Sequence, residues 1–229
     1  MTEANSIPTI AIEKLTGISV NDYLVMLALI MVVSLIFFFL VTRKMSLSNP
    51  TVFQQFCELI VESFDGLLTE IIGHNGRNYL PAMGTFGVLI FLSNFAGFIP
   101  GLMPPTGNIV VTLSLGLCSF LVYNLIGLYK GGFSYIKHFL GPIAAIAILF
   151  APIELVSHCF RPISLGIRLF CNIFGDHQVG SIFLQLVPVA IPVPFILLGL
   201  FVAFMQTFVF VLLSAVYIAM ALPHNDENH

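Results

Sequence analysis

The sequence ELVSHCFRPISLGIRLFCNIFG, Glu154 to Gly175, decides how this chain must fold. Its polar residues recur three or four positions apart, so at about 100° per residue they fall within roughly 40° of one line along a helix. The members of this polar stripe are Glu154, Ser157, Arg161, Ser164, Arg168, Asn172 and Gly175. A cation in hydrocarbon costs at least about 2.5 to 3.5 kcal/mol on insertion scales, so Arg168 should face water or an ionised partner. The stripe therefore predicts an ion path.

The composition is that of an integral membrane protein. Of the 229 residues, 58% are hydrophobic and 8% are charged, whereas soluble domains carry roughly 25% charged residues. No basic patch indicates nucleic acid as a partner, and no glycine-rich phosphate loop indicates nucleotide chemistry. The four cysteines lack C-x-x-C spacing, and no histidine cluster has metal-ligand spacing. We therefore expect neither a cofactor nor a metal.

Hydropathy predicts an all-α fold with about five membrane helices and an amphipathic surface helix. Segments near 20 apolar residues match roughly 30 Å of hydrocarbon, and an alternation of apolar and acidic residues marks the surface helix. We expect an exposed N-terminal leader, a single membrane domain and a polar tail. Their bounds are 1–20 for the leader, 21–223 for the domain, 224–229 for the tail, 51–72 for the surface helix, and 22–42, 82–100, 108–128, 143–187 and 190–222 for the spans.

The last two spans are too long to cross the membrane upright. A continuous helix over 143–187 would run to roughly 67 Å, about twice the thickness of the hydrocarbon. The segment 190–222 is also longer than one upright crossing requires. We therefore expect two long, strongly tilted helices that form a hairpin.

Two basic clusters predict the same orientation in the membrane. Arg43 and Lys44 follow the first span, and Lys130 and Lys137 flank the short loop GGFSYIKHFLG. Positive residues favour the cytoplasmic side. The N-terminus is therefore expected outside and the C-terminus in the cytoplasm.

Several ordered blocks resemble the a subunit of F-type ATP synthases, the ATP synthase A chain family. They agree with that subunit in order and spacing over roughly residues 20–222. The blocks are SLGIRLFCNIFG at Ser164–Gly175, YLPAMGTF at Tyr79–Phe86, LSNFAGFIPG at Leu92–Gly101, PTGN at Pro105–Asn108, and Gln206 followed by Phe208, Phe210 and Tyr217.

This resemblance implies a stator ion-channel subunit in the membrane sector of a bacterial-type ATP synthase. Such a subunit is not itself an enzyme and binds no nucleotide. It provides two offset aqueous half-channels that couple proton translocation to rotation of the c-ring. Its partners are the c-subunit ring, the peripheral-stalk b subunits, the whole ATP synthase complex and membrane lipid. The expected location is the bacterial plasma (inner) membrane, as a multi-pass protein.

By the same resemblance, Arg168 is the essential stator charge and Gln206 is its partner. Two unit charges about 4 Å apart interact by about 4 kcal/mol at an effective dielectric near 20, so Arg168 would favour loss of the proton from each passing ring carboxylate. A guanidinium stays protonated, so it cannot relay protons itself. A proton would enter from one side of the membrane, be carried on a carboxylate of the rotating ring, and leave on the other side.

The expected orientation assigns the other polar residues to sides. Those lining the cytoplasmic path are Glu154, Ser157 and Ser164, and those lining the outer path are Asn172, Asp176 and His177. His177 titrates nearest neutrality, but it projects about 180° from Arg168. Related bacterial subunits often carry an acid at the position of His177 and a histidine at that of Gly199. Whether Asp176 or His177 exchanges protons is therefore left open, and protons are favoured over sodium.

Purely structural roles compete with these functional ones. Glu154 and Arg161 could form a structural ion pair. Amides at Asn94, Asn124 and Gln206 could serve only as interhelical hydrogen-bonding groups, and His74, His138 and His158 are expected to be surface or core residues. A stand-alone secondary transporter or ion channel is the alternative function, but such folds usually carry internal repeats, which this sequence lacks. A non-conducting assembly subunit would leave the polar stripe without a purpose.

Overall fold

The chain folds into helices throughout the part that the computed structural model describes. That part comprises residues 6–16, 21–43, 50–73, 76–99, 101–138, 147–186 and 192–222. The α-helices are α1 (Ile7–Thr16), α2 (Asp22–Arg43), α3 (Val52–Ile72), α4 (Leu80–Ala96), α5 (Ile109–His138), α6 (Ala147–Leu186) and α7 (Pro192–Ala221), with 3-10 turns η1 (Gly76–Tyr79) and η2 (Pro105–Gly107). The prediction of an all-α fold is confirmed.

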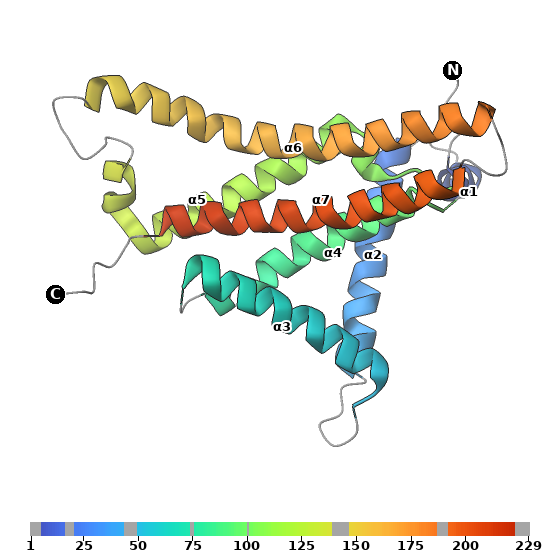
Figure 1. Ribbon diagram of the computed structural model, residues 1–229, viewed down its shortest axis with the longest axis horizontal. Coiled ribbons are helices and arrows are strands. Elements are labelled where there is room, and N and C mark those ends of the chain that lie inside the picture. The colour runs from blue at the N-terminus through green and yellow to red at the C-terminus, as the bar shows by residue number, and fades with distance from the viewer. Residues whose placement is uncertain are drawn as a thin grey trace.

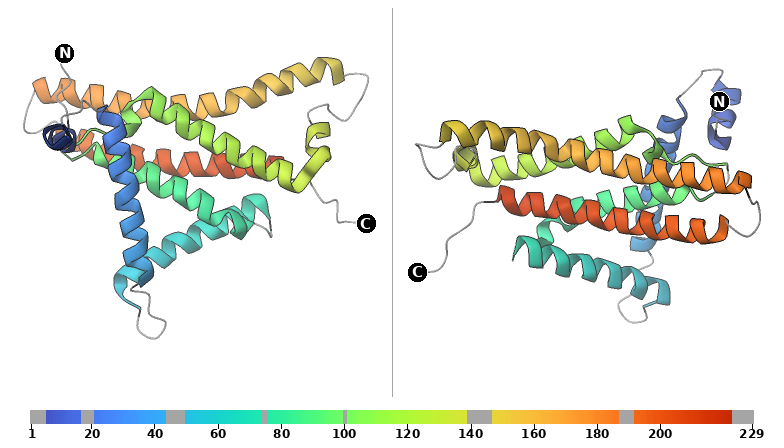
Figure 2. Two further views of the ribbon diagram at one scale, coloured as in Figure 1. Left: turned by 180° about the vertical axis from the view of Figure 1, so that it is seen from behind. Right: turned by 45° about the horizontal axis from the view of Figure 1, so that its top comes forward.

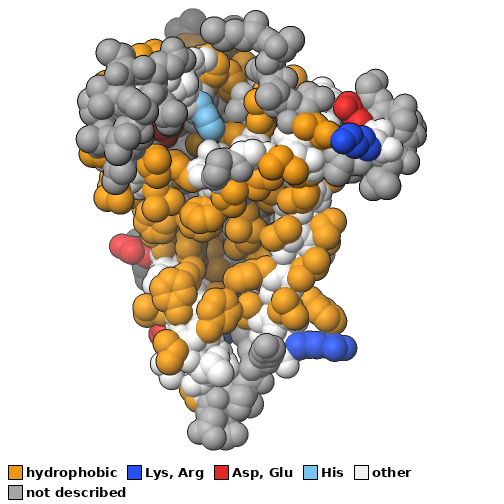
Figure 3. All heavy atoms as spheres, turned by 90° about the vertical axis from the view of Figure 1, so that its right-hand side faces the viewer, with side chains coloured by type: hydrophobic (Ala, Val, Ile, Leu, Met, Phe, Trp, Pro, Cys, Tyr) orange, Lys and Arg blue, Asp and Glu red, His pale blue; other side chains and the backbone are white. Residues whose placement is uncertain are grey.

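Within the described residues, four stretches are long and apolar enough to cross a membrane. They are Asp22–Arg43, Gly76–Ala96, Ile109–Gly132 and Pro194–Ala221. Helix α6, with 40 residues, is not among them, because charged and amide side chains recur along it. Large apolar side chains are exposed on α2, α5, α6 and α7, and the end view in Figure 3 shows a mostly hydrophobic surface with few charges. Such a surface suits lipid.

Helices α6 and α7 form the predicted hairpin. They run antiparallel and side by side, and both lie across the direction of α2 (Figures 1 and 2). Helix α2 has 22 residues, close to the number that spans the hydrocarbon upright. Relative to α2, the last two helices are strongly tilted. Tilt lets 40 and 30 residues lie within the thickness of a bilayer.

The helices are held together by three groups of buried side chains. The largest joins α3, α4, α5 and α7, a second joins α4, α6 and α7, and a third joins α2 and α4. Their members are, in turn, Leu68, Tyr79, Met83, Tyr123, Val211, Ala215, Ile218 and Ala221; Ile90, Leu165, Leu169 and Phe210; and Met26, Ile30 and Ala96. Lipid is as apolar as these residues, so close packing and interhelical hydrogen bonds provide the stability.

Helix α3 is the predicted amphipathic surface helix. The Thr51 hydroxyl caps its first turn by accepting from the backbone N–H of Gln54 at 3.3 Å. Gly73 ends the helix with φ +89°, a conformation that favours glycine. Leu68 is fully buried, whereas Glu58 and Glu62 are exposed. One face therefore packs on the bundle, whereas the exposed surface carries both acidic side chains and large apolar ones such as Phe53 and Phe56.

The end of the span expected at 108–128 differs from the structure. The helix expected at 108–128 continues as α5 to His138, so much of the expected loop after Lys130 is helical. The direction changes inside α5 at Gly132, where φ is +50° and ψ is −132°. Glycine adopts this conformation without the clash of a β-carbon, which allows the helical segments to join through a kink.

The N-terminal leader was expected to be exposed, but its described part, 6–16, is partly buried. Ser6 and Thr9 are buried, and both hydroxyls hydrogen-bond to the Asp22 carboxylate at the start of α2. The Ser6 backbone N–H donates to the same carboxylate at 3.2 Å, and that of Ile7 donates to the Gly101 carbonyl at 3.2 Å. These polar contacts fix α1 on the bundle. The tail 224–229 and His74 lie outside the described residues.

Candidate functional site

The residues of the polar stripe on α6 differ in burial: some are exposed, and others are partly buried against neighbouring helices. The side chains of Ser157, Ser164 and Arg168 are exposed, while Glu154, Arg161 and Asn172 are partly buried. Along one flank of the stripe, Leu165, Leu169 and Ile173 are buried in the bundle. This division follows from the helical period, because residues three or four apart share a face. Three of the seven stripe members thus lie on the exposed face of α6.

Arg168 lies exposed among apolar side chains. Ile163, Ile167 and Phe174 are exposed on the same helix. Within the described residues, the Arg168 guanidinium has no hydrogen bond, ion pair or ring contact. Such a cation on an apolar surface requires water or an ionised group from another molecule. The surface around Arg168 is therefore the strongest candidate for contact with a charged partner.

Gln206 has a different partner from the one expected. Its Oε1 accepts a hydrogen bond of 2.6 Å from Nδ2 of Asn172, across the α6–α7 interface. Gln206 is 4% exposed, and its Nε2 finds no hydrogen-bond partner among the described residues. No bond joins Gln206 to Arg168 in the described part of the chain. Asn172 lies one turn after Arg168, so Gln206 is near the cation without touching it.

Asp176 and His177 point to different neighbours. A buried carboxylate oxygen of Asp176, Oδ2, has no hydrogen-bond partner within the described residues. It faces α7, because a β-carbon added at Gly199 would lie 3.7 Å from it. Nε2 of His177 instead lies against Gly97, where an added β-carbon would be 2.8 Å away. Oδ2 of Asp176 therefore faces α7, whereas Nε2 of His177 faces the end of α4.

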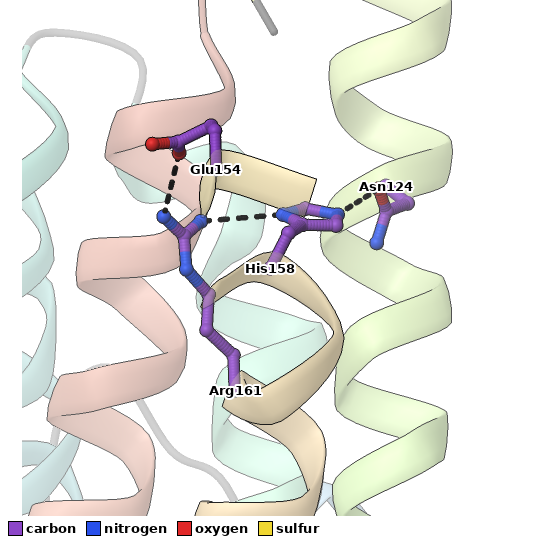
Figure 4. Close-up of polar contacts among 4 residues, drawn as sticks. All are labelled: Asn124, Glu154, His158 and Arg161. Atoms are coloured by element: carbon purple, nitrogen blue, oxygen red, sulfur yellow. Dashed lines mark hydrogen bonds and ion pairs between the residues drawn. The ribbon is translucent and has the colours of Figure 1, made fainter. Parts of the chain in front are cut away.

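A chain of polar contacts links α5 to α6 near the start of the stripe (Figure 4). Nη2 of Arg161 lies 3.5 Å from Oε1 of Glu154, and Nη1 lies 3.4 Å from Nδ1 of His158. Nε2 of His158 is 2.9 Å from Oδ1 of Asn124 on α5. We call these four residues the His158 network. The Arg161 guanidinium also lies over the Tyr217 ring of α7, 5.4 Å from its centroid.

His158 and Asn124 were not among the site residues expected from the sequence. His158 was expected to be a surface or core residue, and it is buried, 6% exposed. The sequence spacing could have placed His158 beside Glu154 and Arg161. His158 lies four residues after Glu154 and three before Arg161, so the three side chains are neighbours on one face of a helix. Interhelical hydrogen bonding was the competing role for Asn94, Asn124 and Gln206. Each of the three does bond to another element: Asn94 to Thr106 at 2.9 Å, Asn124 to His158 and Gln206 to Asn172.

Glycines allow α5 and α6 to approach closely at the middle of the stripe. A β-carbon at Gly116 would lie 2.5 Å from the carbonyl oxygen of Pro162. One at Gly166 would lie 2.9 Å from Cα of Leu113. Small residues at such crossings are typical of membrane helices. The contact fixes the register that brings His158 to Asn124.

No metal site is found in the described part of the chain, where no three histidine, cysteine or acidic side chains gather closely enough to bind an ion. Cys57, Cys118, Cys159 and Cys171 are not in disulfides. The chemistry that these residues can support is proton exchange and charge stabilisation.

Comparison with known proteins gives a consistent match over most of the chain. The model of the family described as ATP synthase A chain matches residues 24–219. ATP synthase subunit a of Sulfurihydrogenibium sp. (strain YO3AOP1) is 40% identical over 207 residues, which cover 90% of this chain and 100% of that protein. The subunit of Bdellovibrio bacteriovorus is 46% identical over 169 residues, 73% of this chain and 74% of that protein. The subunit of Geobacter sulfurreducens is 37% identical over 200 residues, 87% and 86% respectively.

Proposed function

Because this chain belongs to the ATP synthase A chain family, we propose that it is the stator of the ion channel in an F-type ATP synthase. Its own residues would provide two offset half-channels and an essential charge between them. The observation that carries the proposal is Arg168, exposed on α6 and without a partner in the described part of the chain. The c-subunit ring, with a membrane-embedded carboxylate on each subunit, has the chemistry to complete this site.

The proposed mechanism follows from the fixed charge of Arg168. A ring carboxylate in lipid keeps its proton, because an ion in hydrocarbon is costly. Near the guanidinium the ionised form gains about 4 kcal/mol at 4 Å and an effective dielectric near 20. The carboxylate therefore releases its proton to one path as it approaches Arg168 and takes another proton from the other path as it leaves. Arg168 stays protonated and blocks direct passage.

The cytoplasmic path is proposed to run along Glu154, Ser157 and Ser164. Ser157 and Ser164 are exposed on α6, and the side chain of Glu154 is 42% exposed. Hydroxyls can hold a file of water, and the Glu154 carboxylate can accept a proton from it. The Glu154–Arg161 contact does not exclude this role, because at 3.5 Å it leaves the carboxylate loosely held.

The outer path is proposed to run along Asn172, Asp176 and His177, with Asp176 as the proton-exchanging group. Oδ2 of Asp176 is buried and has no hydrogen-bond partner among the described residues. It faces Gly199 of α7, which has no side chain. A buried carboxylate without a donor is costly when ionised, so it needs water or a proton. His177 packs against Gly97 instead, which favours a structural part for its ring.

Gln206 is proposed to act on the Arg168 site through Asn172. The bond to Asn172 occupies Oε1 and leaves the buried Nε2 without an acceptor in the described residues. Gln206 would thus hold the Asn172 side chain in place, one helical turn after Arg168, and through it the surface next to the cation.

The remaining features of the proposal concern the assembly. The peripheral-stalk b subunits would hold this subunit against the turning ring, in a bacterial plasma (inner) membrane. The membrane domain would cover 21–223, with the N-terminus outside and the C-terminus in the cytoplasm. The chain itself would bind no nucleotide.

Removing the cation tests the proposed function. In vesicles that hold the whole complex, Arg168→Ala should abolish ATP-driven acidification while the subunit still assembles. Arg168→Lys should also fail, because an ammonium is more strongly hydrated and can lose its proton. Arg77→Ala is the matched control, since Arg77 is exposed and its ion pair among the described residues is with Asp65, at 3.9 Å. Normal pumping by Arg168→Ala would refute the proposal, and ion flux through the isolated subunit would favour a stand-alone channel.

A further inference from the structure

The contacts of the His158 network fit an assignment of donors and acceptors in which the imidazole ring is neutral. A guanidinium only donates, so Nδ1 of His158, 3.4 Å from Nη1 of Arg161, must be an acceptor without a proton. The proton of the neutral ring then lies on Nε2, which donates to Oδ1 of Asn124 at 2.9 Å. Nδ2 of Asn124 donates in turn to the Phe120 carbonyl at 2.8 Å. Each of these contacts then joins a donor to an acceptor, and His158 is neutral in this arrangement.

The neutral ring divides the Arg161 guanidinium between two acceptors. One nitrogen faces Nδ1 of His158, and another faces Oε1 of Glu154 at 3.5 Å. The second distance is longer than that of an ordinary charge-assisted hydrogen bond, about 2.7 to 2.9 Å. The side chain of Arg161 is 17% exposed, and the Tyr217 ring lies below it. Its position is therefore fixed by His158, Tyr217 and Glu154 together.

We propose that His158 is a positioning residue for Glu154, a role that rests on the proposed function of Glu154 in the cytoplasmic path. By accepting from Arg161, neutral His158 keeps the guanidinium from closing fully on the Glu154 carboxylate. The carboxylate then remains available to take up a proton and to release it to water. Loss of the acceptor lets Arg161 pair tightly with Glu154, which holds Glu154 ionised and slows proton exchange.

Protonation of His158 removes the acceptor in the same way. A proton on Nδ1 would face the Arg161 guanidinium, donor against donor and cation against cation. Among the described residues, the rings of Phe120 and Tyr123 on α5 also face His158, and Tyr217 on α7 lies against Tyr123; the carboxylate that contacts Arg161 is that of Glu154. Glu154 is therefore the anion that the displaced Arg161 meets. Acidification of the cytoplasmic side should therefore protonate His158 and lower the rate of pumping.

Two amide substitutions separate the positioning role from a merely structural one. In His158→Asn, the side-chain oxygen lies near the former Nδ1 and can accept from Arg161. In His158→Gln, the amide reaches the former Nε2 and can donate to Asn124, but nothing replaces Nδ1. A structural anchor between α5 and α6 would be kept better by glutamine. The positioning role is kept by asparagine, and neither amide titrates.

The experiment uses the whole complex in vesicles with its cytoplasmic side facing outward and the interior buffered. ATP-driven acidification is measured against outer pH between about 5 and 8 and divided by the ATPase rate of uncoupled vesicles. We expect wild type to lose pumping as the pH falls, and His158→Asn to pump at a ratio independent of pH. We expect His158→Gln to pump roughly tenfold less at neutral pH, because a small displacement of a transferring group is costly.

Two results would overturn the inference. One is a pH profile of His158→Asn that matches wild type, and the other is pumping by His158→Gln that equals or exceeds that of His158→Asn. If His158→Gln fails to assemble, the comparison of wild type with His158→Asn still decides. Arg168→Ala in the same vesicles tests the proposed function separately, because inactive Arg168→Ala beside unaffected His158 variants would refute only the role of His158.

Discussion

Substituting Gly116 by alanine should disable the channel from a position that touches no polar residue of the stripe. The new β-carbon would lie 2.5 Å from the Pro162 carbonyl oxygen, whereas ordinary contact begins at 3.4 Å. The Pro162 carbonyl and the nearby Gly166 amide nitrogen, 3.3 Å away, belong to the backbone of α6, so neither can rotate away. Helices α5 and α6 would have to separate by about 0.9 Å, because packed interiors do not absorb such an overlap.

That separation moves α6 toward the side on which Arg168 is exposed. Overpacking of this kind costs roughly 1 to 3 kcal/mol, which a multi-helix subunit can tolerate. A displacement near 1 Å at a reacting group can lower a rate about 100-fold. We therefore expect Gly116→Ala complexes to assemble and to pump at least about tenfold more slowly than wild type. The shift also stretches the 2.9 Å bond between His158 and Asn124.

The assay is ATP-driven acidification of vesicles, normalised to the assembled subunit. Gly180→Ala is the matched control, because it lies on α6 and an added β-carbon there meets nothing within 4 Å. Both substitutions raise helix propensity by about 1 kcal/mol, so the control separates contact from propensity. Assembled Gly116→Ala that pumps as fast as Gly180→Ala would refute the reasoning.

Three further predictions concern the stripe itself. Asp176→Asn should abolish acidification while His177→Gln keeps most of it, because Asp176 has a buried carboxylate oxygen that faces α7. Loss of acidification in His177→Gln but not in Asp176→Asn would make His177 the exchanging group. Asn172→Leu should lower the stability of the complex in thermal melts by roughly 1 to 3 kcal/mol, because it leaves the buried Gln206 amide unbonded. Adding Gln206→Leu should recover part of this loss of stability. Additive losses from the two substitutions would contradict a direct bond between the residues. Acidification in sodium-free buffer should match that in sodium, and strict sodium dependence would contradict proton transport.

The helices and the hairpin could be predicted because the membrane restricts the choices. Hydrocarbon thickness fixes the length of an upright span, and the helical period places Arg161, Arg168 and Asn172 near one line. A segment too long to stand upright must tilt. These arguments need only local composition and spacing, so a single sequence suffices for them.

Contacts between helices could not be predicted in the same way. Gln206 was expected at Arg168, and its partner is Asn172, one helical turn away. A turn advances the chain by only about 5.4 Å, and the relative register of α6 and α7 depends on packing along the whole interface. The bond between His158 and Asn124 likewise depends on the close approach of α5 and α6 at Gly116. Neither register can be read from hydropathy.

The partial burial of α1 has a similar cause. Ser6 and Thr9 were assigned to an exposed leader on polarity alone, yet the Asp22 carboxylate accepts from both hydroxyls. A short polar segment becomes buried when acceptors across the interface satisfy its donors. Such a match between distant residues is visible only in the folded chain.

The central claim is that Arg168 separates two aqueous paths that open to opposite sides of the membrane. Its most direct test is the sidedness of introduced cysteines in whole complexes whose four native cysteines have been replaced. The cysteines are placed one at a time at Glu154, Ser157, Asn172 and His177, and an impermeant thiol reagent is applied from each side. We expect the first two to react only from the cytoplasmic side and the last two only from the outside. Reaction of all four from the same side would contradict the claim.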